Sequence, residues 1–307
     1  MTTSQIAVRL ACPGDVSAIH DVTRQAFAAR QPLDPPAEAL SDTIDDVTAA
    51  LDAGVGVIGE VDGRIAGSLL VRLDEAAGGQ TIATLRRVGV LPEFRHLGVA
   101  DAMVRSTLRG LADSGVRRAR LLARMELPQI VAWWQARGFL IDHDVPHGFI
   151  MSANLPSPVD VPTPDHMRAL GRSLAKHMRA GDLVIASGDL GAGKTVLAQG
   201  IGEGLGVTGP VISPTFVLAR VHKSAAGLGL VHVDAYRLAS AAELEDIDVD
   251  AALTDSVVYI EWGAGLAEGL NDQRLEVHIE RLPGDTRRVY LMPVGRRWRE
   301  LADWEAA

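Results

Sequence analysis

Eight consecutive residues in the second half of the sequence have the types and spacing of a loop that binds nucleotide phosphates. Residues 188–195 read Gly-Asp-Leu-Gly-Ala-Gly-Lys-Thr and match G-x-x-x-x-G-K-[ST] at every defined position. The small residues allow backbone amides to turn toward a β-phosphate, while Lys194 can reach the β- and γ-phosphates and the Thr195 hydroxyl can bind Mg²⁺. The apolar run 183–186 precedes the loop and a helical pattern follows it. We therefore expect a nucleotide-binding site here.

Hydrolysis of a bound nucleotide also needs carboxylates near the phosphates, and two acidic residues end apolar, strand-like runs. Asp234 follows the run 228–233 in the manner of a Walker B carboxylate. Glu261 follows the run 257–260 and precedes Trp262. We expect at least one of the two acids in the shell of the metal. Their positions leave open which acid holds Mg²⁺ and which orients water.

A weaker anion-binding pattern occurs in the first half of the sequence. Residues 95–100 read Arg-His-Leu-Gly-Val-Ala, follow a strand-like run and open a helical pattern. Amides at a helix N-terminus attract an anion, and Gly98 and Ala100 are small enough for its close approach. The turn has no lysine and no hydroxyl for a metal. It therefore favours a metal-free pyrophosphate, such as that of coenzyme A.

Strand-like and helix-like patterns alternate in both halves of the chain and can position these motifs. In the first half we expect helices at 13–29, 37–53, 98–114 and 128–137, and strands at 6–10, 56–61, 65–73, 81–91, 116–123, 138–141 and 147–153. In the second half we expect helices at 165–179, 193–205 and within 241–253, and strands at 182–186, 217–221, 228–233, 257–260, 274–280 and 288–293. Asp62-Gly63 is a two-residue hairpin signal. Both halves are thus predicted to be α/β: a mixed sheet with flanking helices, then a P-loop NTPase-type sheet.

The proline-rich segment 154–164 divides the two halves. Its two Pro-x-Pro pairs lack amide donors for a sheet and favour an extended path, so we expect a semi-rigid linker. The predicted domains are residues 1–153 and residues 165–307. A length of 307 residues agrees with two domains, each with its own core.

The composition excludes several classes of protein. The chain is 47% apolar and contains one cysteine, Cys12, which rules out a disulfide framework and which we expect to be a small buried residue. No apolar run is long enough to span a membrane, and the N-terminus does not resemble a signal peptide, so we expect a cytoplasmic protein with no membrane contact. The formal net charge of −9 argues against a protein that holds nucleic acid by itself.

The second half, over roughly residues 165–293, resembles the TsaE (YjeE-like) family. This family is the ATPase subunit of the bacterial system that makes N6-threonylcarbamoyladenosine at position 37 of tRNA. The resemblance rests on four motifs in order, at residues 188–195, 213–216, 232–238 and 260–262. It implies a Mg²⁺-dependent ATPase that works with TsaD- and TsaB-type protein partners and contacts tRNA indirectly.

The resemblance also implies roles for individual residues. Thr195 and Glu261 would be Mg²⁺ ligands, Asp234 a catalytic or metal-shell acid, and Thr215 part of a switch-like loop that senses the nucleotide. The implied catalytic residues are Lys194, Asp234, Glu261 and Trp262. The implied ATP-binding residues are Gly188, Leu190, Gly191, Ala192, Gly193, Lys194, Thr195, Val196 and Thr215. Met167 occupies the position of a family threonine near the base, so the adenine contacts are left open.

The first half, over roughly residues 5–153, resembles the GNAT N-acetyltransferase family. Four features align in order: an Arg-x-Ala-x-x-x-Asp start at Arg9, the hairpin with Gly67, the turn at 95–100, and the segment 133–139. The resemblance implies acetyl-CoA binding. The implied contacts are Val90 to the pantetheine and acetyl groups, and the amides of Arg95, His96, Gly98, Val99 and Ala100 to the pyrophosphate.

The catalytic side of this second resemblance is left open. Trp134 stands where many members have a tyrosine general acid, and an indole cannot protonate a thiolate. Glu93, His143 and Asp144 are the available titratable alternatives.

These features predict an ATPase subunit of the tRNA system fused to an acyltransferase or acyl-CoA-binding domain. Three alternatives are left open: an acetyltransferase regulated by a nucleotide-sensing P-loop domain, a P-loop small-molecule kinase, and a non-enzymatic scaffold.

Overall fold

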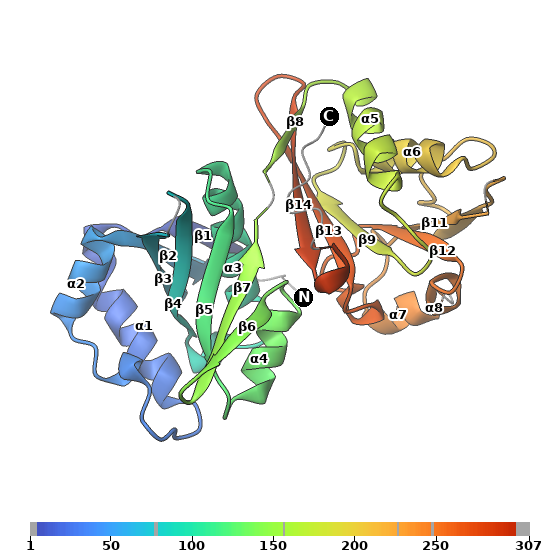
Figure 1. Ribbon diagram of the computed structural model, residues 1–307. Coiled ribbons are helices and arrows are strands. Elements are labelled where there is room, and N and C mark those ends of the chain that lie inside the picture. Colours follow the sequence, from blue (N-terminus) through green and yellow to red (C-terminus); the bar gives the residue numbers. More distant parts are fainter. Residues whose placement is uncertain (1–4, 77–78, 156, 226, 247–248, 299–307) are drawn as a thin grey trace. The chain divides into compact units, whose positions relative to one another are not determined.

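The computed structural model describes residues 5–76, 79–155, 157–225, 227–246 and 249–298. The chain forms two compact α/β units (Figure 1), one of residues 1–132 and 141–155 and the other of residues 133–140 and 156–307. Parts of the expected linker and domains, namely Pro156 and both chain ends, lie outside the described residues. No helix within those described ranges is both long and apolar enough to cross a membrane.

A seven-stranded mixed sheet forms the N-terminal unit, in the order β1-β2-β3-β4-β5-β7-β6. Its strands are β1 (Ile6–Leu10), β2 (Gly54–Val61), β3 (Arg64–Glu75), β4 (Thr81–Val90), β5 (Arg118–Arg124), β6 (Leu140–Val145) and β7 (Gly148–Asn154). β4 and β5 run parallel, and their pairing covers only Ile82–Thr84 and Arg118–Arg120. Both strands continue beyond this pairing, so they separate toward their carboxyl ends.

The helices of the N-terminal unit cover both faces of the sheet. They are α1 (Val16–Ala28), α2 (Ile44–Asp52), α3 (Val99–Asp113) and α4 (Pro128–Gln135). A Cβ added at Gly56 would meet Leu51 and Ile19, on the side of α1 and α2, whereas one at Gly59 would meet Val99 and Met103 of α3. Because these two glycines have opposite parity along one strand, α3 lies on the opposite face from α1 and α2.

Turn and cap residues decide where the elements of this unit begin. Asp62 and Gly63 have φ of 49° and 76°, so the predicted hairpin turn between β2 and β3 is confirmed. The predicted helix 37–53 is wrong in its first part, which is a 3₁₀ turn at Glu38–Leu40 followed by α2. Thr43 interrupts the helix because its side chain accepts from the Asp46 amide, while Asp46 bonds back to the Thr43 amide as a capping box.

An ion pair joins the first strand to the first helical turn. The Arg9 guanidinium donates to both carboxylate oxygens of Asp15, over 2.7 and 2.9 Å, and holds the pKa of Asp15 well below its ordinary value. The arginine and aspartate of the expected start motif are therefore a structural pair. Cys12, between them, is exposed, so the expectation that it is buried is wrong. It lies in the turn after β1, where its amide donates to Asp15.

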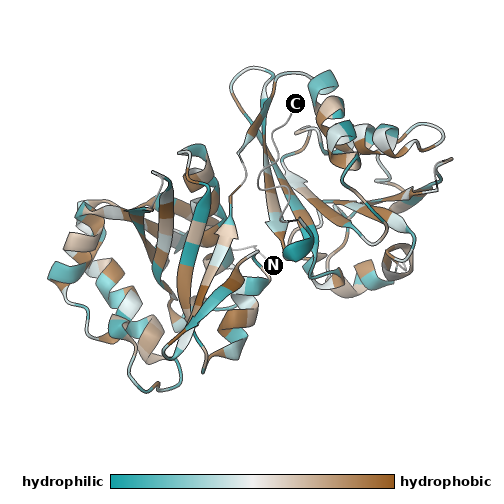
Figure 2. Cartoon of the chain, in the orientation of Figure 1, coloured by the Kyte–Doolittle hydropathy of each residue, from teal (hydrophilic) through white to brown (hydrophobic). Residues whose placement is uncertain are grey.

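The C-terminal unit also has a seven-stranded sheet, in the order β10-β11-β12-β9-β13-β14-β8. Its strands are β8 (Val159–Val161), β9 (Leu183–Gly188), β10 (Ala219–His222), β11 (Gly229–Asp234), β12 (Ser256–Glu261), β13 (Arg274–Arg281) and β14 (Arg287–Val294). The central strands β11, β12, β9 and β13 are parallel. Helices α5 (Pro164–Ala175) and α6 (Lys194–Leu205) contribute to one core cluster, and α7 (Ala241–Glu245) and α8 (Val249–Ala252) to another. In Figure 2 the helices carry both hydrophilic and hydrophobic residues, as expected for helices that cover a sheet.

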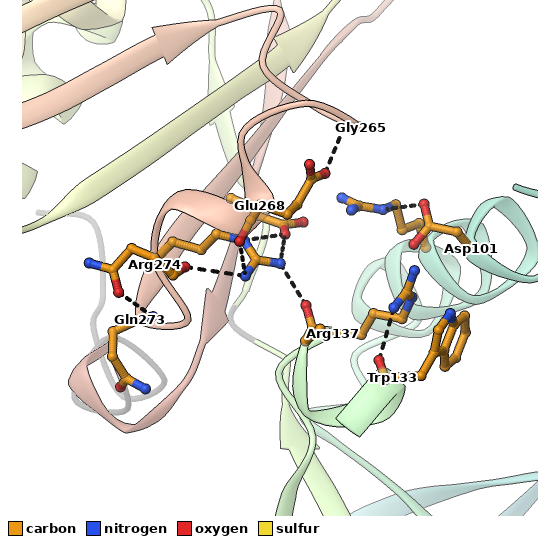
Figure 3. Close-up of polar contacts among 11 residues, drawn as sticks. Asp101, Trp133, Arg137, Gly265, Glu268, Gln273 and Arg274 are labelled. Atoms are coloured by element: carbon orange, nitrogen blue, oxygen red, sulfur yellow. Dashed lines mark hydrogen bonds and ion pairs between the residues drawn. The ribbon is translucent and has the colours of Figure 1, made fainter. Parts of the chain in front are cut away.

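A buried arginine fixes the start of β13 in this sheet. Arg274 is 1% exposed, and its guanidinium donates to the Glu276 carboxylate over 2.7 and 2.9 Å (Figure 3). Its other nitrogen lies 3.5 Å from the backbone oxygen of Glu268. Because a buried guanidinium without acceptors is strongly unfavourable, these bonds hold the turn before β13 in place.

Part of the proline-rich segment belongs to the C-terminal sheet. Val159–Val161 forms the edge strand β8, which pairs antiparallel with Arg287–Val289 of β14. The expectation that the whole segment lacks sheet hydrogen bonds is therefore wrong. Its prolines flank these three residues, and an edge strand needs amide donors on one side only.

The close contact between α5 and α6 depends on glycine. A Cβ added at Gly200 would lie 2.2 Å from the backbone oxygen of Arg168, and one at Gly171 would lie 2.6 Å from that of Leu197. Backbone atoms cannot move aside as a side chain can. The two helices therefore approach more closely than residues with a Cβ would permit.

We predict that Gly200→Ala lowers the free energy of opening of α5 and α6 by about 1–3 kcal/mol, because the added methyl group overlaps backbone. Gly110→Ala, in the exposed part of α3 with no atom within 4 Å of the added Cβ, should instead stabilise its helix by about 0.5–1 kcal/mol. Native-state hydrogen exchange measures the two elements separately. Equal changes in the free energy of opening for Gly200→Ala and Gly110→Ala would contradict the close contact between α5 and α6.

Candidate nucleotide-binding site

The phosphate-binding loop connects β9 to α6. Gly188, Gly191 and Gly193 have φ of 140°, 74° and 108°, backbone conformations that L-residues with a side chain rarely adopt. At Gly188 a Cβ would also lie 2.4 Å from the backbone oxygen of Ile279. The glycine spacing read in the sequence is therefore a steric requirement of this turn.

Lys194, the first residue of α6, is held inside the loop. Its side chain is nearly inaccessible, and its ammonium donates to the backbone oxygens of Gly188 and Asp189 over 2.8 and 3.0 Å. The same nitrogen lies 3.7 Å from the centre of the Trp262 ring, a cation–π contact. Burial lowers the pKa of Lys194, although Glu261 and other nearby carboxylates oppose this shift.

The two expected acids lie side by side and have different partners. Asp234 and Glu261 are register partners at the carboxyl ends of the parallel strands β11 and β12, and both are buried. Glu261 Oε1 accepts from the Thr195 hydroxyl over 2.8 Å, so this acid is connected to the phosphate-binding loop. Asp234 Oδ2 accepts from the Thr215 hydroxyl over 2.6 Å, so this acid is connected to the segment before β10.

The side-chain oxygens of Thr195 and Glu261 are of the kind that coordinates Mg²⁺. This ion takes oxygen ligands, and in nucleotide sites it uses one or two protein groups together with phosphates and water. The described residues contain no cluster of three or more His, Cys, Asp or Glu side chains able to hold a metal by themselves. Thr195 and Glu261 thus fit a Mg²⁺ ion whose remaining ligands come from the nucleotide and water.

Two buried polar side chains beneath the loop were not singled out by sequence reasoning. His232 is fully buried, and its Nε2 lies 2.8 Å from Glu261 Oε1. Tyr259, its register partner on β12, donates its hydroxyl to the backbone oxygen of Lys194 over 2.7 Å. Burial raises the pKa of Tyr259, which keeps the hydroxyl protonated as a donor. A histidine and a tyrosine inside otherwise apolar strands were the available sequence signal.

The segment around Thr215 exposes several large apolar side chains beside the site. Phe216 is 87% exposed, and Ile212, Val217 and Tyr236 are also exposed. The Tyr236 ring lies 5.1 Å from that of Trp262, and the Tyr236 amide donates to Asp234 over 3.0 Å. The expected switch-like loop is thus connected to Asp234 through Thr215, and Tyr236, which follows β11, connects the same acid to Trp262.

Some expected nucleotide-binding residues do not direct side chains into the loop. Leu190 is 81% exposed, and Val196 is partly buried and packs against the core cluster that includes α5 and α6. Ala192 is buried, as a tight turn requires. Met167 of α5 is buried, and its terminal methyl group lies 3.4 Å from where a Cβ would stand on Gly193. This residue therefore packs behind the loop.

The expected anion-binding turn of the N-terminal unit lies at the start of α3. Gly98 is the N-cap of this helix with φ of 86°, and His96 also has a positive φ of 67°. Val90 ends β4, where β4 and β5 have separated. Arg95 points away from the turn, because its guanidinium donates to the Ala26 backbone oxygen over 3.2 Å. Val99 is buried, so at Val99 and Ala100 only backbone groups are offered to a ligand.

Trp134 is a packing residue. It is 5% exposed, and its ring meets those of Trp133 and Phe139 edge-on, with centroids 4.8 and 5.0 Å apart. The Arg137 guanidinium lies over the Trp133 ring and donates to its backbone oxygen (Figure 3). The alternative titratable residues Glu93, His143 and Asp144 are all exposed.

Comparisons with known proteins bear on both halves. Residues 161–289 match the family described as threonylcarbamoyl adenosine biosynthesis protein TsaE, and residues 18–139 match the acetyltransferase (GNAT) family. These matches confirm the two resemblances found in the sequence. A Streptomyces coelicolor protein named tRNA threonylcarbamoyladenosine biosynthesis protein TsaE is 57% identical over 138 residues, which are 43% of this chain and 93% of that protein. The Bacillus subtilis protein of the same name is 35% identical over 46% of this chain and 87% of its own length.

Solved structures also resemble the two halves separately. The crystal structure of Bacillus subtilis YdiB is 29% identical, with a TM-score of 0.40, and covers 48% of this chain and 90% of its own. The Thermoplasma acidophilum PaiA N-acetyltransferase in complex with coenzyme A is 13% identical, with a TM-score of 0.43, and covers 49% of this chain and 99% of its own.

We predict that His232→Leu raises the Mg²⁺ concentration needed for half-maximal nucleotide binding by about tenfold, because Glu261 loses the group that orients it. His222→Leu is the matched control: this histidine is also buried, on the adjacent strand β10, without a hydrogen bond to either acid. Fluorescence of a labelled ATP titrated with Mg²⁺ measures both variants. An equal increase in the required Mg²⁺ concentration for both variants would mean that the loss of a buried histidine disturbs the core, and would contradict a specific role of His232.

Proposed function

Because the chain belongs to the TsaE family of threonylcarbamoyl adenosine biosynthesis proteins, we propose that its C-terminal unit is a Mg²⁺-dependent ATPase required for the N6-threonylcarbamoyl modification of adenosine 37 in tRNA. The observation that carries this proposal is the 2.8 Å bond between Thr195 and Glu261 beneath a complete phosphate-binding loop. It joins the helix that receives the phosphates to the strand end that supplies a carboxylate.

Each residue of the site then has a distinct part. The bound Mg²⁺ neutralises charge on the phosphates, and Thr195 and Glu261 would hold it. Lys194 contacts the β- and γ-phosphates in place of the two backbone oxygens it now bonds. Asp234 would orient the attacking water, because it is the carboxylate of the pair that is not bonded to the proposed Mg²⁺ ligand Thr195. Trp262 faces the Lys194 ammonium and limits its movement.

The contacts of Thr215 support a coupling between hydrolysis and partner proteins. A change at the phosphates alters the Asp234–Thr215 bond, and the next residue along the chain is the exposed Phe216. Large exposed apolar side chains are typical of surfaces that a partner covers. TsaD- and TsaB-type subunits are the proposed partners. With a net charge of −9, this chain would contribute little to holding tRNA, so we assign that contact to the partners.

For the N-terminal unit we propose binding of acetyl-CoA. The pantetheine would lie beside Val90, where β4 and β5 are no longer paired, and the N-terminus of α3 would offer amides to the pyrophosphate. Acyl transfer is a second candidate function, and the residue expected to protonate the thiolate is replaced by the packed Trp134. A proton donor would then have to be another group, such as Glu93, His143, Asp144, the acceptor or water.

We predict that Lys194→Ala reduces ATP hydrolysis by about 100-fold or more without unfolding the C-terminal unit, because the charge facing the phosphates is lost. Lys176→Ala, which removes an exposed lysine just after α5, should leave hydrolysis unchanged. Both variants are also introduced into a strain that lacks its own TsaE subunit, and the modified nucleoside in tRNA is quantified by mass spectrometry. Restoration of the nucleoside by the Lys194 variant would refute the proposed ATPase role.

For the N-terminal unit, we predict that Gly98→Ala weakens acetyl-CoA binding by about tenfold, because the φ of 86° at the helix N-cap is strained by a side chain. Gly115→Ala is the matched control, since it has φ of 85° just beyond the other end of α3. Isothermal titration calorimetry of the full chain gives the affinities, and release of free coenzyme A with a panel of amines tests transfer. Absence of acetyl-CoA binding in the unmodified chain would refute the proposal.

A further inference from the structure

An irregularity in β4 places two consecutive arginines on one face of the N-terminal sheet. Leu70 and Ser68 of β3 pair with Arg86 and Gly89 of β4, so β4 has one residue more than its partner at this point. The extra residue belongs to a β-bulge, in which two successive residues oppose one on the neighbouring strand. Arg87 has φ of 53° within it. The two residues that oppose Leu69 are Arg87 and Val88, and Arg86 is the regularly paired residue before them. The bulge interrupts the regular alternation after Arg86, and the side chains of Arg86 and Arg87 line the same cavity.

Both arginines line a cavity between α2 and the sheet. Its volume is about 300 Å³, at the lower end of the range of small-molecule pockets. One wall is aliphatic, with Val47 and Ala50 of α2 and Leu70 of β3. Leu70 lies opposite Arg86, so the two side chains share a face. The cavity thus combines an apolar wall with guanidinium groups.

The charged groups of the cavity are already paired, with one exception. Arg87 donates to both oxygens of Asp42 over 2.6 and 2.9 Å. Arg72 pairs with Asp74 at 2.8 Å. The carboxylate of Asp46 accepts from the hydroxyl and the amide of Thr43, which lowers the pKa of Asp46.

Arg86 is the exception. It is half-buried, and within the described ranges its side chain has neither a hydrogen bond nor an ion pair. A guanidinium that is partly removed from water without an acceptor raises the free energy of the folded chain, and an anion in the cavity would reverse this. The fork of the guanidinium fits a carboxylate with two parallel hydrogen bonds.

We propose that this cavity binds a small monocarboxylate with a short aliphatic chain, held by Arg86. One unpaired guanidinium matches one carboxylate. A doubly charged anion would face Asp42 and Asp46, while Arg72 and Arg87, the other cationic side chains among the described lining residues, are already in ion pairs. The aliphatic part contacts Val47, Ala50 and Leu70. This site is separate from the nucleotide site and does not depend on ATP hydrolysis or acyl transfer.

The probe for this proposal is butanoate, compared with butanamide and butylamine, which have a similar size but no negative charge. Saturation-transfer NMR on the full chain gives the three affinities. We expect saturable binding of butanoate and about tenfold or weaker binding of the two analogues, since neither can form the bidentate ion pair of a carboxylate with Arg86.

Two variants test the site itself. Arg86→Gln should weaken butanoate binding by about tenfold or more, and Ala50→Leu, which fills the aliphatic end and keeps Arg86, should weaken it as well. Arg24→Gln, which removes an exposed arginine of α1 that does not line the cavity, should bind as the unmodified chain does. Circular dichroism checks that each variant is folded. The proposal is overturned by absence of butanoate binding, by equal binding of butylamine, or by unchanged binding to folded Arg86→Gln.

Discussion

The parallel pairing of β11 with β12 is the constraint on which the candidate ATPase site depends. It sets Asp234 opposite Glu261 and, two residues earlier, His232 opposite Tyr259. The first pair reaches the site, and the second pair lies beneath it. Through this second pair, Glu261 is held from below and the first turn of α6 is fixed to the sheet. A shift of either strand by one residue would point the two side chains of that strand to the opposite face of the sheet and separate them from their partners.

The parts of this site that follow from local chemistry could be predicted from the sequence. The glycine spacing of residues 188–193 reflects backbone angles that only glycine adopts readily, so the loop was recognisable. The two acids were recognisable because each ends an apolar strand. Their different hydrogen-bond partners, Thr195 for Glu261 and Thr215 for Asp234, could not be read from their positions in the sequence. The choice of partner is made by strand order, with β12 lying between β11 and β9.

The N-terminal unit shows the same limit of local reasoning. Its hairpin and most of its strands follow from turn residues and alternation, whereas the two bulged residues of β4, Arg87 and Val88, are neither glycine nor proline and gave no signal in the sequence. The predicted helix 37–53 was too long at its N-terminus, because α2 begins only after Thr43. The Thr43 side chain accepts a hydrogen bond from a backbone amide and caps the helix there. In the proline-rich segment, local composition was misleading for Val159–Val161, since an edge strand tolerates flanking prolines.

The glycines that bring α5 and α6 together have a consequence for the order of folding. α6 contains Gly200, Gly202 and Gly204, and each lowers the intrinsic stability of a helix by about 1 kcal/mol relative to alanine. A helix of this composition does not persist by itself and forms when it docks on α5 and the sheet. Lys194 and Thr195 stand in its first turn. We therefore expect the phosphate-binding loop to acquire its shape only when α6 has packed on α5 and the sheet, and a bound phosphate would stabilise the packed arrangement.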